Sequence, residues 1–192
     1  MKTKRASYLA FTVLVLVILA CGSGVQVNTP TEQGGVPPVA EVQATSTAPV
    51  GAARSNPAPA GSEVVADDMA FVVTGSTRPA TDVVMAGNQF NTRPEAGQEY
   101  AIVNVRITCR KSSDDKCSLF SYSLKLLGSS GIQRDPELFV TGVSGLIDFS
   151  ITEFFGGATL EGGIPFIVNS DETDLLLVYS PLFGNPFYLA IQ

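Results

Sequence analysis

Strict alternation of apolar and polar side chains marks the segment from Tyr100 to Cys109 (YAIVNVRITC). One face of this segment carries five apolar residues, namely Ala101, Val103, Val105, Ile107 and Cys109. A period of two over this length is typical of a half-buried antiparallel strand. We therefore predict a strand over residues 100–109.

Strand-like patterns continue through most of residues 63–192, and Gly or Pro occupies every gap. Residues 120–127 alternate in the same way as residues 100–109. Shorter apolar runs occur at residues 69–74, 83–90, 138–141, 151–155, 163–168, 175–179 and 187–191. No stretch of twelve residues free of Gly and Pro has a helical period of 3.6. About 7–9 short strands at this spacing predict an all-β, antiparallel β-sandwich over residues 63–192.

The first 20 residues have the pattern of an export signal. A basic start at Lys2, Lys4 and Arg5 precedes the apolar run LAFTVLVLVILA at residues 9–20. A helix of twelve residues rises about 18 Å, which is short of the ~30 Å hydrocarbon core of a membrane. The sequence ILACG at residues 18–22 then resembles the lipobox of bacterial lipoproteins, in which Cys21 is lipidated and becomes the mature N-terminus. A plain signal peptide or an uncleaved anchor, with Cys21 incidental, is the alternative.

Residues 21–62 have the composition of a tether. Pro, Gly, Ser and Thr fill 20 of the 41 positions from 22 to 62, and no aromatic residue occurs there. Such a stretch cannot bury enough apolar surface to offset the entropy of ordering, so we expect it to be disordered. It acts either as a spacer that lifts the domain away from the membrane or as a link with no length requirement.

Charge and composition exclude several classes of function. The chain has 12 Lys and Arg, 18 Asp and Glu, and no His. The absence of His removes Ser-His-Asp and Cys-His nucleophile systems and His-ligated metal sites. Loss of residues 1–20 would leave 9 basic against 18 acidic residues, and the remainder has no basic cluster. Nucleic-acid binding is therefore not expected, and no cofactor is predicted.

The three cysteines divide into an anchor and a pair. With Cys21 assigned to lipid, Cys109 and Cys117 remain, and they flank a polar loop between two predicted strands. An even number of thiols in an exported domain predicts a disulfide between them. A redox-active pair is the alternative, although seven intervening residues are not the CxxC spacing.

Several features occur together in an order that resembles a known bacterial family. They are the lipobox, the Pro-rich linker, the strand at residues 100–108, the strand ending in Gly128-Ser-Ser-Gly131, and the Gly-rich return from Leu160 to Phe166 before the strand at residues 175–179. The sequence resembles the telokin-like, immunoglobulin-like domains of bacterial lipoproteins, which are related to secreted immunoprotective mycobacterial antigens. This resemblance covers about residues 64–192. It implies an immunoglobulin-like sandwich and no assigned activity, and Cys109 departs from the Asn that is common in the family.

Candidate catalytic and metal-binding residues are few. Asp148 with Glu153 or Glu161 offers the carboxylate pair that a glycosidase needs, but an acidic domain supplies such pairs without catalysis. Two acidic clusters offer weak calcium candidates, Asp114 with Asp115 and Asp171 with Asp174. Neither has the DxDxDG spacing of a calcium loop, and solvated turns explain both. We therefore predict no catalytic residues and no metal site.

An apolar stretch interrupted by Gly, residues 138–164, could either form a ligand groove or fill the sandwich core. Pro165 beside Phe166 indicates an edge strand, which could accept a strand from a partner.

The sequence thus predicts a non-catalytic lipoprotein on the extracytoplasmic face of a bacterial membrane. Its partners would be the membrane, through the lipid on Cys21, and an extracellular protein or cell-wall component bound by the β-sandwich. A passive structural spacer of the envelope is the alternative, and a carboxylate-based hydrolase is a third.

Overall fold

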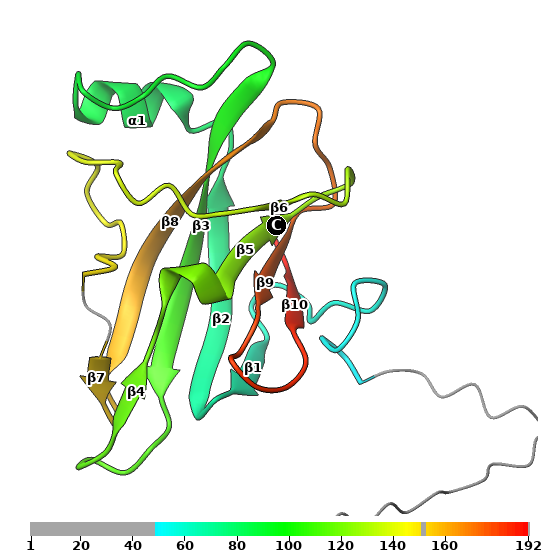
Figure 1. Cartoon of the computed structure of the whole chain (residues 1–192), viewed down its shortest axis with the longest axis vertical. Coiled ribbons are helices and arrows are strands. Elements are labelled where there is room, and N and C mark those ends of the chain that lie inside the picture. Colours follow the sequence, from blue (N-terminus) through cyan, green and yellow to red (C-terminus); the bar gives the residue numbers. More distant parts are fainter. Residues whose placement is uncertain (1–48, 151–152, 192) are drawn as a thin grey trace, which may run out of the picture. The chain divides into compact units, whose positions relative to one another are not determined.

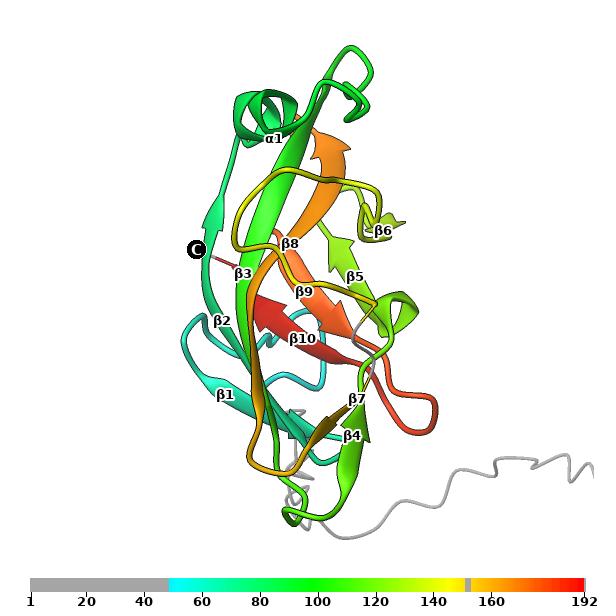
Figure 2. The same ribbon diagram turned by 90° about the vertical axis from the view of Figure 1, so that its left-hand side faces the viewer.

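Two four-stranded antiparallel sheets pack face to face in the computed structural model, which describes residues 49–150 and 153–191 (Figure 1). The first sheet has the order β1 (Glu63–Ala66), β2 (Met69–Thr77), β3 (Gln98–Cys109) and β8 (Thr159–Asn169). The second has the order β10 (Phe187–Ala190), β9 (Leu176–Tyr179), β5 (Leu124–Leu127) and β6 (Gln133–Arg134). A small pair, β4 (Lys116–Ser118) and β7 (Glu153–Phe155), lies at one end (Figure 2). The predicted fold class, an antiparallel β-sandwich, is confirmed.

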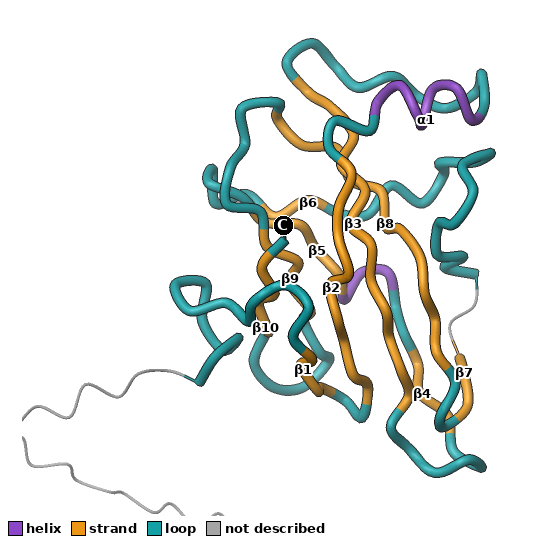
Figure 3. Tube along the Cα trace, turned by 180° about the vertical axis from the view of Figure 1, so that it is seen from behind, coloured by secondary structure: helices purple, strands orange, loops and turns teal. Residues whose placement is uncertain are grey.

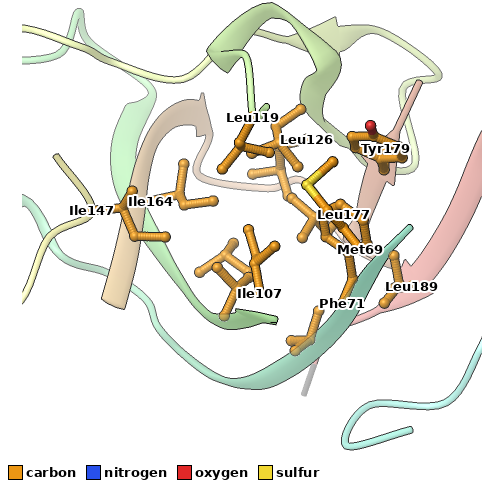
Figure 4. Close-up of a cluster of buried hydrophobic side chains, with 14 of the residues drawn as sticks. Met69, Phe71, Ile107, Leu119, Leu126, Ile147, Ile164, Leu177, Tyr179 and Leu189 are labelled. Carbon is orange, nitrogen blue, oxygen red and sulfur yellow. The ribbon is translucent and has the colours of Figure 1, made fainter. Parts of the chain in front are cut away.

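The core lies between the two sheets. Figure 4 shows Phe71 and Ile107 of the first sheet meeting Leu126 and Leu177 of the second, and all four side chains are at most 1% exposed. The predicted inward face of β3 is confirmed, since all five of its apolar residues are buried. Burial of such side chains stabilises a fold by about 1.5–3 kcal/mol each.

Part of β3 is buried on both faces. Tyr100 and Ile102 point away from the sandwich core, yet they are only 1% and 6% exposed. They pack with Val84 of helix α1 (Thr81–Gly87) and with Val140 and neighbouring residues of the segment before β7. A second, smaller core therefore lies on the outer face of the first sheet.

Three predicted strands are wrong in whole or in part. Residues 83–90 do not form a strand, because residues 81–87 form α1 and only Val84 of this helix is buried (Figure 3). Residues 138–141 form an irregular loop that packs over the sheet. Residues 120–127 are strand only from Leu124, since Ser121–Ser123 form a 3-10 turn that leaves Tyr122 exposed. In each case contacts with distant residues override a local pattern of apolar residues.

The ordered domain begins before the predicted boundary at residue 63. Ala58 is buried and exchanges backbone hydrogen bonds with β10, donating to Tyr188 O (2.8 Å) and accepting from Ala190 N (2.8 Å). Gly51 O accepts from Tyr188 N (2.8 Å), and Arg54 Nη2 donates to Gly128 O (2.7 Å). Residues 49–62, which the composition assigns to the tether, thus cover the edge of the second sheet, because this short Pro-rich segment satisfies the open backbone groups of β10.

The predicted disulfide between Cys109 and Cys117 is present, with the two Cα atoms 5.7 Å apart. It joins the end of β3 to β4, and both residues are 1% exposed. A buried cystine is typical of a structural rather than a redox-active bond.

A hydrogen bond links the two sheets beside β1, which forms the edge of the first sheet opposite to β8. Tyr179 of β9 donates its hydroxyl to Asp67 Oδ2 (2.8 Å), and its ring packs against Phe71 with centroids 4.4 Å apart. Asp67 and Asp68 both have positive φ, as a two-residue hairpin turn between β1 and β2 requires. Burial and the Asp67 carboxylate together raise the pKa of Tyr179 far above its usual range, so this hydroxyl remains a donor.

Candidate binding groove

A groove of about 550 Å³ lies between residues 137–150 and the edge strand β8. In Figures 1 and 2 this yellow segment runs beside β8 and below α1. Polar and apolar groups contribute about equally to the surface of the groove, and its apolar side chains are Leu138, Val140, Val143, Leu146, Ile147, Phe149 and Pro165. Its volume falls within the range of small-ligand sites.

Asn91 fixes the outer wall of the groove. Its side chain is 7% exposed and makes three hydrogen bonds. Nδ2 donates to Val84 O (2.7 Å) and to Thr141 O (2.9 Å), while Oδ1 accepts from Thr141 N (3.0 Å). Asn91 therefore ties α1 to the loop at residues 138–143, since both N–H groups of Nδ2 and one lone pair of Oδ1 bond to backbone partners.

A close approach of two glycines completes this contact. A Cβ atom on Gly142 would lie 2.1 Å from Gly87 O, and the φ of Gly142 is +73°. Only glycine meets both requirements without displacement of the backbone. The loop and the end of α1 are consequently packed backbone to backbone.

Backbone hydrogen bonds attach the inner wall of the groove to β8. Glu137 N donates to Pro165 O (2.8 Å), Ile147 N donates to Gly163 O (2.9 Å), and Gly163 N donates to Gly145 O (2.7 Å). The prediction that Pro165 lies on an edge strand is confirmed by the sheet order. Because residues 136–137 and 145–147 already occupy this edge, strand addition by a partner is excluded along Gly163–Phe166.

Two carboxyl groups line the groove, and their environments differ. Burial raises the pKa of Glu137, and the neighbouring Asp135 raises it further. Hydrogen bonds from Ser150, one of them from its backbone N to Asp148 Oδ1 (2.9 Å), lower the pKa of Asp148. No Lys or Arg is among the residues that line the groove. The groove therefore combines several apolar side chains with negative charge.

The carboxylates considered for hydrolysis do not come together. Glu153 Oε2 accepts from Lys116 Nζ at 2.9 Å, and Glu161 Oε2 lies 3.6 Å from Arg106 Nε, both at the surface. Asp148 alone of the three lines the groove. The structure thus places Glu137, which the sequence did not single out, as the second carboxyl group of this site.

The weak calcium candidates occupy separate turns. Asp115 Oδ2 accepts from Ser112 Oγ (2.6 Å) in the loop that also holds Asp114, and Asp174 Oδ2 accepts from Thr173 Oγ1 (3.2 Å) near Asp171. Within residues 49–150 and 153–191, no group of three or more acidic, His or Cys side chains is arranged to hold a metal ion. Turn formation accounts for both clusters.

Glu172, between two of those candidates, has a structural role. The residue is 6% exposed, and its Oε1 accepts from Ser130 N (2.6 Å). Burial by itself raises the pKa of Glu172, but the Ser130 hydrogen bonds and the nearby Arg134 and Arg78 outweigh it, so the pKa lies below its ordinary value of 4.5. The charged carboxylate therefore stabilises the loop that follows β8.

Replacing Glu172 by Gln should lower the free energy of unfolding by about 1 kcal/mol at pH 7. Because the pKa of Glu172 is lowered on folding, its contribution is present above pH 4.5 and is lost as pH falls through the folded value. Denaturant unfolding at pH 7 and pH 3 should therefore show a smaller acid loss for Glu172→Gln than for the wild type. Asp171→Asn, at an exposed neighbour, is the control, and equal acid sensitivity of wild type and Glu172→Gln would refute the assignment.

The exposed fractions of the side chains in residues 138–164 show which of them belong to the core and which to the groove. Ile147 and Phe154 are buried in the sandwich core, whereas Leu138 is 49% and Phe139 92% exposed. Residues 138–164 therefore contribute both to the sandwich core and to the groove. Asn91 and Glu137 were missed because their roles depend on residues about 50 and 28 positions away, at Thr141 and Pro165, and no local motif marks them.

The sequence matches no protein-family model and no curated protein. Among solved structures, it is similar to the YjhA protein from Bacillus subtilis (13% identity, TM-score 0.48), covering 70% of this chain and 99% of that chain. It is also similar to the secreted protein MPT63 from Mycobacterium tuberculosis (13% identity, TM-score 0.49, 70% and 97% covered). The candidate lipoprotein YcdA from Bacillus subtilis is a further neighbour (15% identity, TM-score 0.47, 68% and 38% covered). These likenesses concern the fold.

Among the residues that the structure describes, no helix is long and apolar enough to cross a membrane. Cys21, the export signal and residues 21–48 of the tether lie outside the described residues.

Proposed function

We propose that this chain is a lipoprotein of the telokin-like kind, anchored through Cys21 on the extracytoplasmic face of a bacterial membrane, with a non-catalytic binding module as its β-sandwich. The proposed binding surface is the groove between residues 137–150 and β8. The seven apolar side chains that line it together with two carboxyl groups and no cation are the observation that carries the proposal. An apolar site with a few placed polar groups is the usual form of a ligand site.

The anchor is supported by the basic start, the apolar run and the lipobox-like ILAC at residues 18–21. The buried disulfide supports an oxidising compartment, where such bonds persist. A passive spacer of the envelope is the alternative function, and it requires no occupied groove.

Photocrosslinking in the producing cells separates these two functions. A benzophenone amino acid at Leu138, on the groove, should give a discrete adduct, because a bound ligand would lie within reach of the probe. The same probe at Val65 of β1 is the control, since Val65 is 54% and Leu138 49% exposed. The adduct at position 138 should weaken in the Glu137→Gln/Asp148→Asn variant. Equal labelling at both positions, unchanged by that variant, would support the spacer instead.

A further inference from the structure

Two of the most exposed aromatic rings stand on neighbouring loops beside the groove. Phe90 is 82% and Phe139 92% exposed. Phe90 follows α1, whereas Phe139 lies between Leu138 and Val140, which line the groove. We call these two rings the aromatic tip.

The loops that carry the aromatic tip are held in place by hydrogen bonds. Phe90 N donates to Asn88 Oδ1 (3.0 Å), and Asn88 Nδ2 donates to Thr141 Oγ1 (2.7 Å). The three bonds of buried Asn91 hold the same two loops together. Exposed aromatic side chains that stand on neighbouring, fixed loops are suited to act as the anchors of a recognition surface.

Charge decides what kind of partner fits. The groove beside the tip is lined by Glu137 and Asp148 and by no cation, so it repels phosphate headgroups and favours a cationic group. The aromatic rings favour an apolar or aromatic side chain, or the face contact that Arg makes. A polypeptide supplies both kinds of side chain at a spacing of a few residues, which a neutral glycan does not.

We propose that the aromatic tip and the groove form one binding surface for an extended peptide segment of an extracellular protein. The partner places a Lys or Arg against Glu137 and Asp148 in the groove. An aromatic or large aliphatic side chain of the same segment packs on Phe90 and Phe139. This inference rests on the proposed function of the groove and adds the class of partner and a second half of the site.

Selection of random twelve-residue peptides on phage tests the inference. The bait is the full mature chain from residue 21, with Cys21→Ser to prevent acylation. Selected peptides should carry Lys or Arg together with an aromatic residue. Affinities are then measured with Trp-containing versions of the selected peptides, whose emission is specific because the protein has no Trp.

Matched variants separate the two halves of the site. Phe90→Ser/Phe139→Ser should weaken peptide binding about tenfold, as loss of an aromatic anchor does. Phe183→Ser should leave binding unchanged, because Phe183 is 89% exposed but belongs to the loop between β9 and β10, which lies well below α1 in Figure 1. None of these substitutions removes a buried side chain, so all the variants should fold, and circular dichroism checks this. Phe90→Leu/Phe139→Leu provides a second pair, with a smaller expected loss.

The outcomes are distinct. If Glu137→Gln/Asp148→Asn weakens binding and the Phe90/Phe139 variants do not, the groove is retained as a binding site, and the role of the aromatic tip in binding is refuted. If no selected peptide responds to either set of variants, the proposed function of the groove fails as well. Tip-dependent binding to anionic phospholipid vesicles, without peptide binding, would overturn the inference in favour of membrane contact.

Discussion

Replacement of Asn91 by Ala is expected to lower the free energy of unfolding by about 2–3 kcal/mol and to free the loop at residues 138–143. The change removes three hydrogen bonds and leaves the N–H and C=O of Thr141 and the C=O of Val84 without their partner. A buried polar group that loses its partner costs about 1–3 kcal/mol. Denaturant unfolding gives the total, and hydrogen exchange at Thr141 N–H reports the local opening.

The matched control is Asn88→Ala. Asn88 donates to the same residue, at Thr141 Oγ1, and accepts from Phe90 N, but both bonds are exposed, so their loss together should cost about 0.5–1 kcal/mol. Gly142→Ala should resemble Asn91→Ala in its local effect, because the new Cβ would lie 2.1 Å from Gly87 O. Protection of Thr141 N–H that is unchanged in Asn91→Ala would contradict this account of the groove wall.

Reduction of the Cys109–Cys117 disulfide should lower the free energy of unfolding by about 2.5 kcal/mol. The bond closes a loop with a sequence separation of 8, and the chain-entropy relation for about nine residues gives this value. The measurement is the denaturant midpoint of the same chain with and without reductant. Both sulfur-bearing residues are 1% exposed, so strong reductant or mild denaturant is needed to reach the bond.

Cys109→Ala/Cys117→Ala is the control for the reductant. Its midpoint should lie below that of the oxidised wild type and should not move when reductant is added. A wild-type midpoint that is equally insensitive to full reduction would show that the bond contributes nothing to stability.

Strict alternation of apolar and polar residues predicted the sandwich correctly, whereas short apolar runs led to wrong strand predictions. The alternation in β3 correctly predicted its inward face, because five apolar side chains at a period of two can all be buried in only one orientation of the strand. Helix α1 escaped prediction because seven residues with one buried side chain, Val84, show no helical period. The outward burial of Tyr100 was also not predictable, because it depends on the later segment that covers it.

The candidate site was predicted only in outline. The apolar stretch 138–164 pointed to a groove or a core, and the structure shows residues of both kinds in it. No sequence pattern pointed to Asn91, because its partner Thr141 is 50 residues away. Long-range hydrogen bonds of this kind leave no periodic trace, whereas the disulfide was predictable from cysteine count and compartment alone.

Intact-mass spectrometry of the protein from membrane extracts, with and without reduction and thiol alkylation, tests the central claim of an exported, lipid-anchored binding module. The account predicts a mature N-terminus at Cys21 that carries acyl mass, and alkylation of two thiols only after reduction. An unacylated chain with Cys109 and Cys117 alkylated before reduction would contradict both the anchor and the extracytoplasmic location.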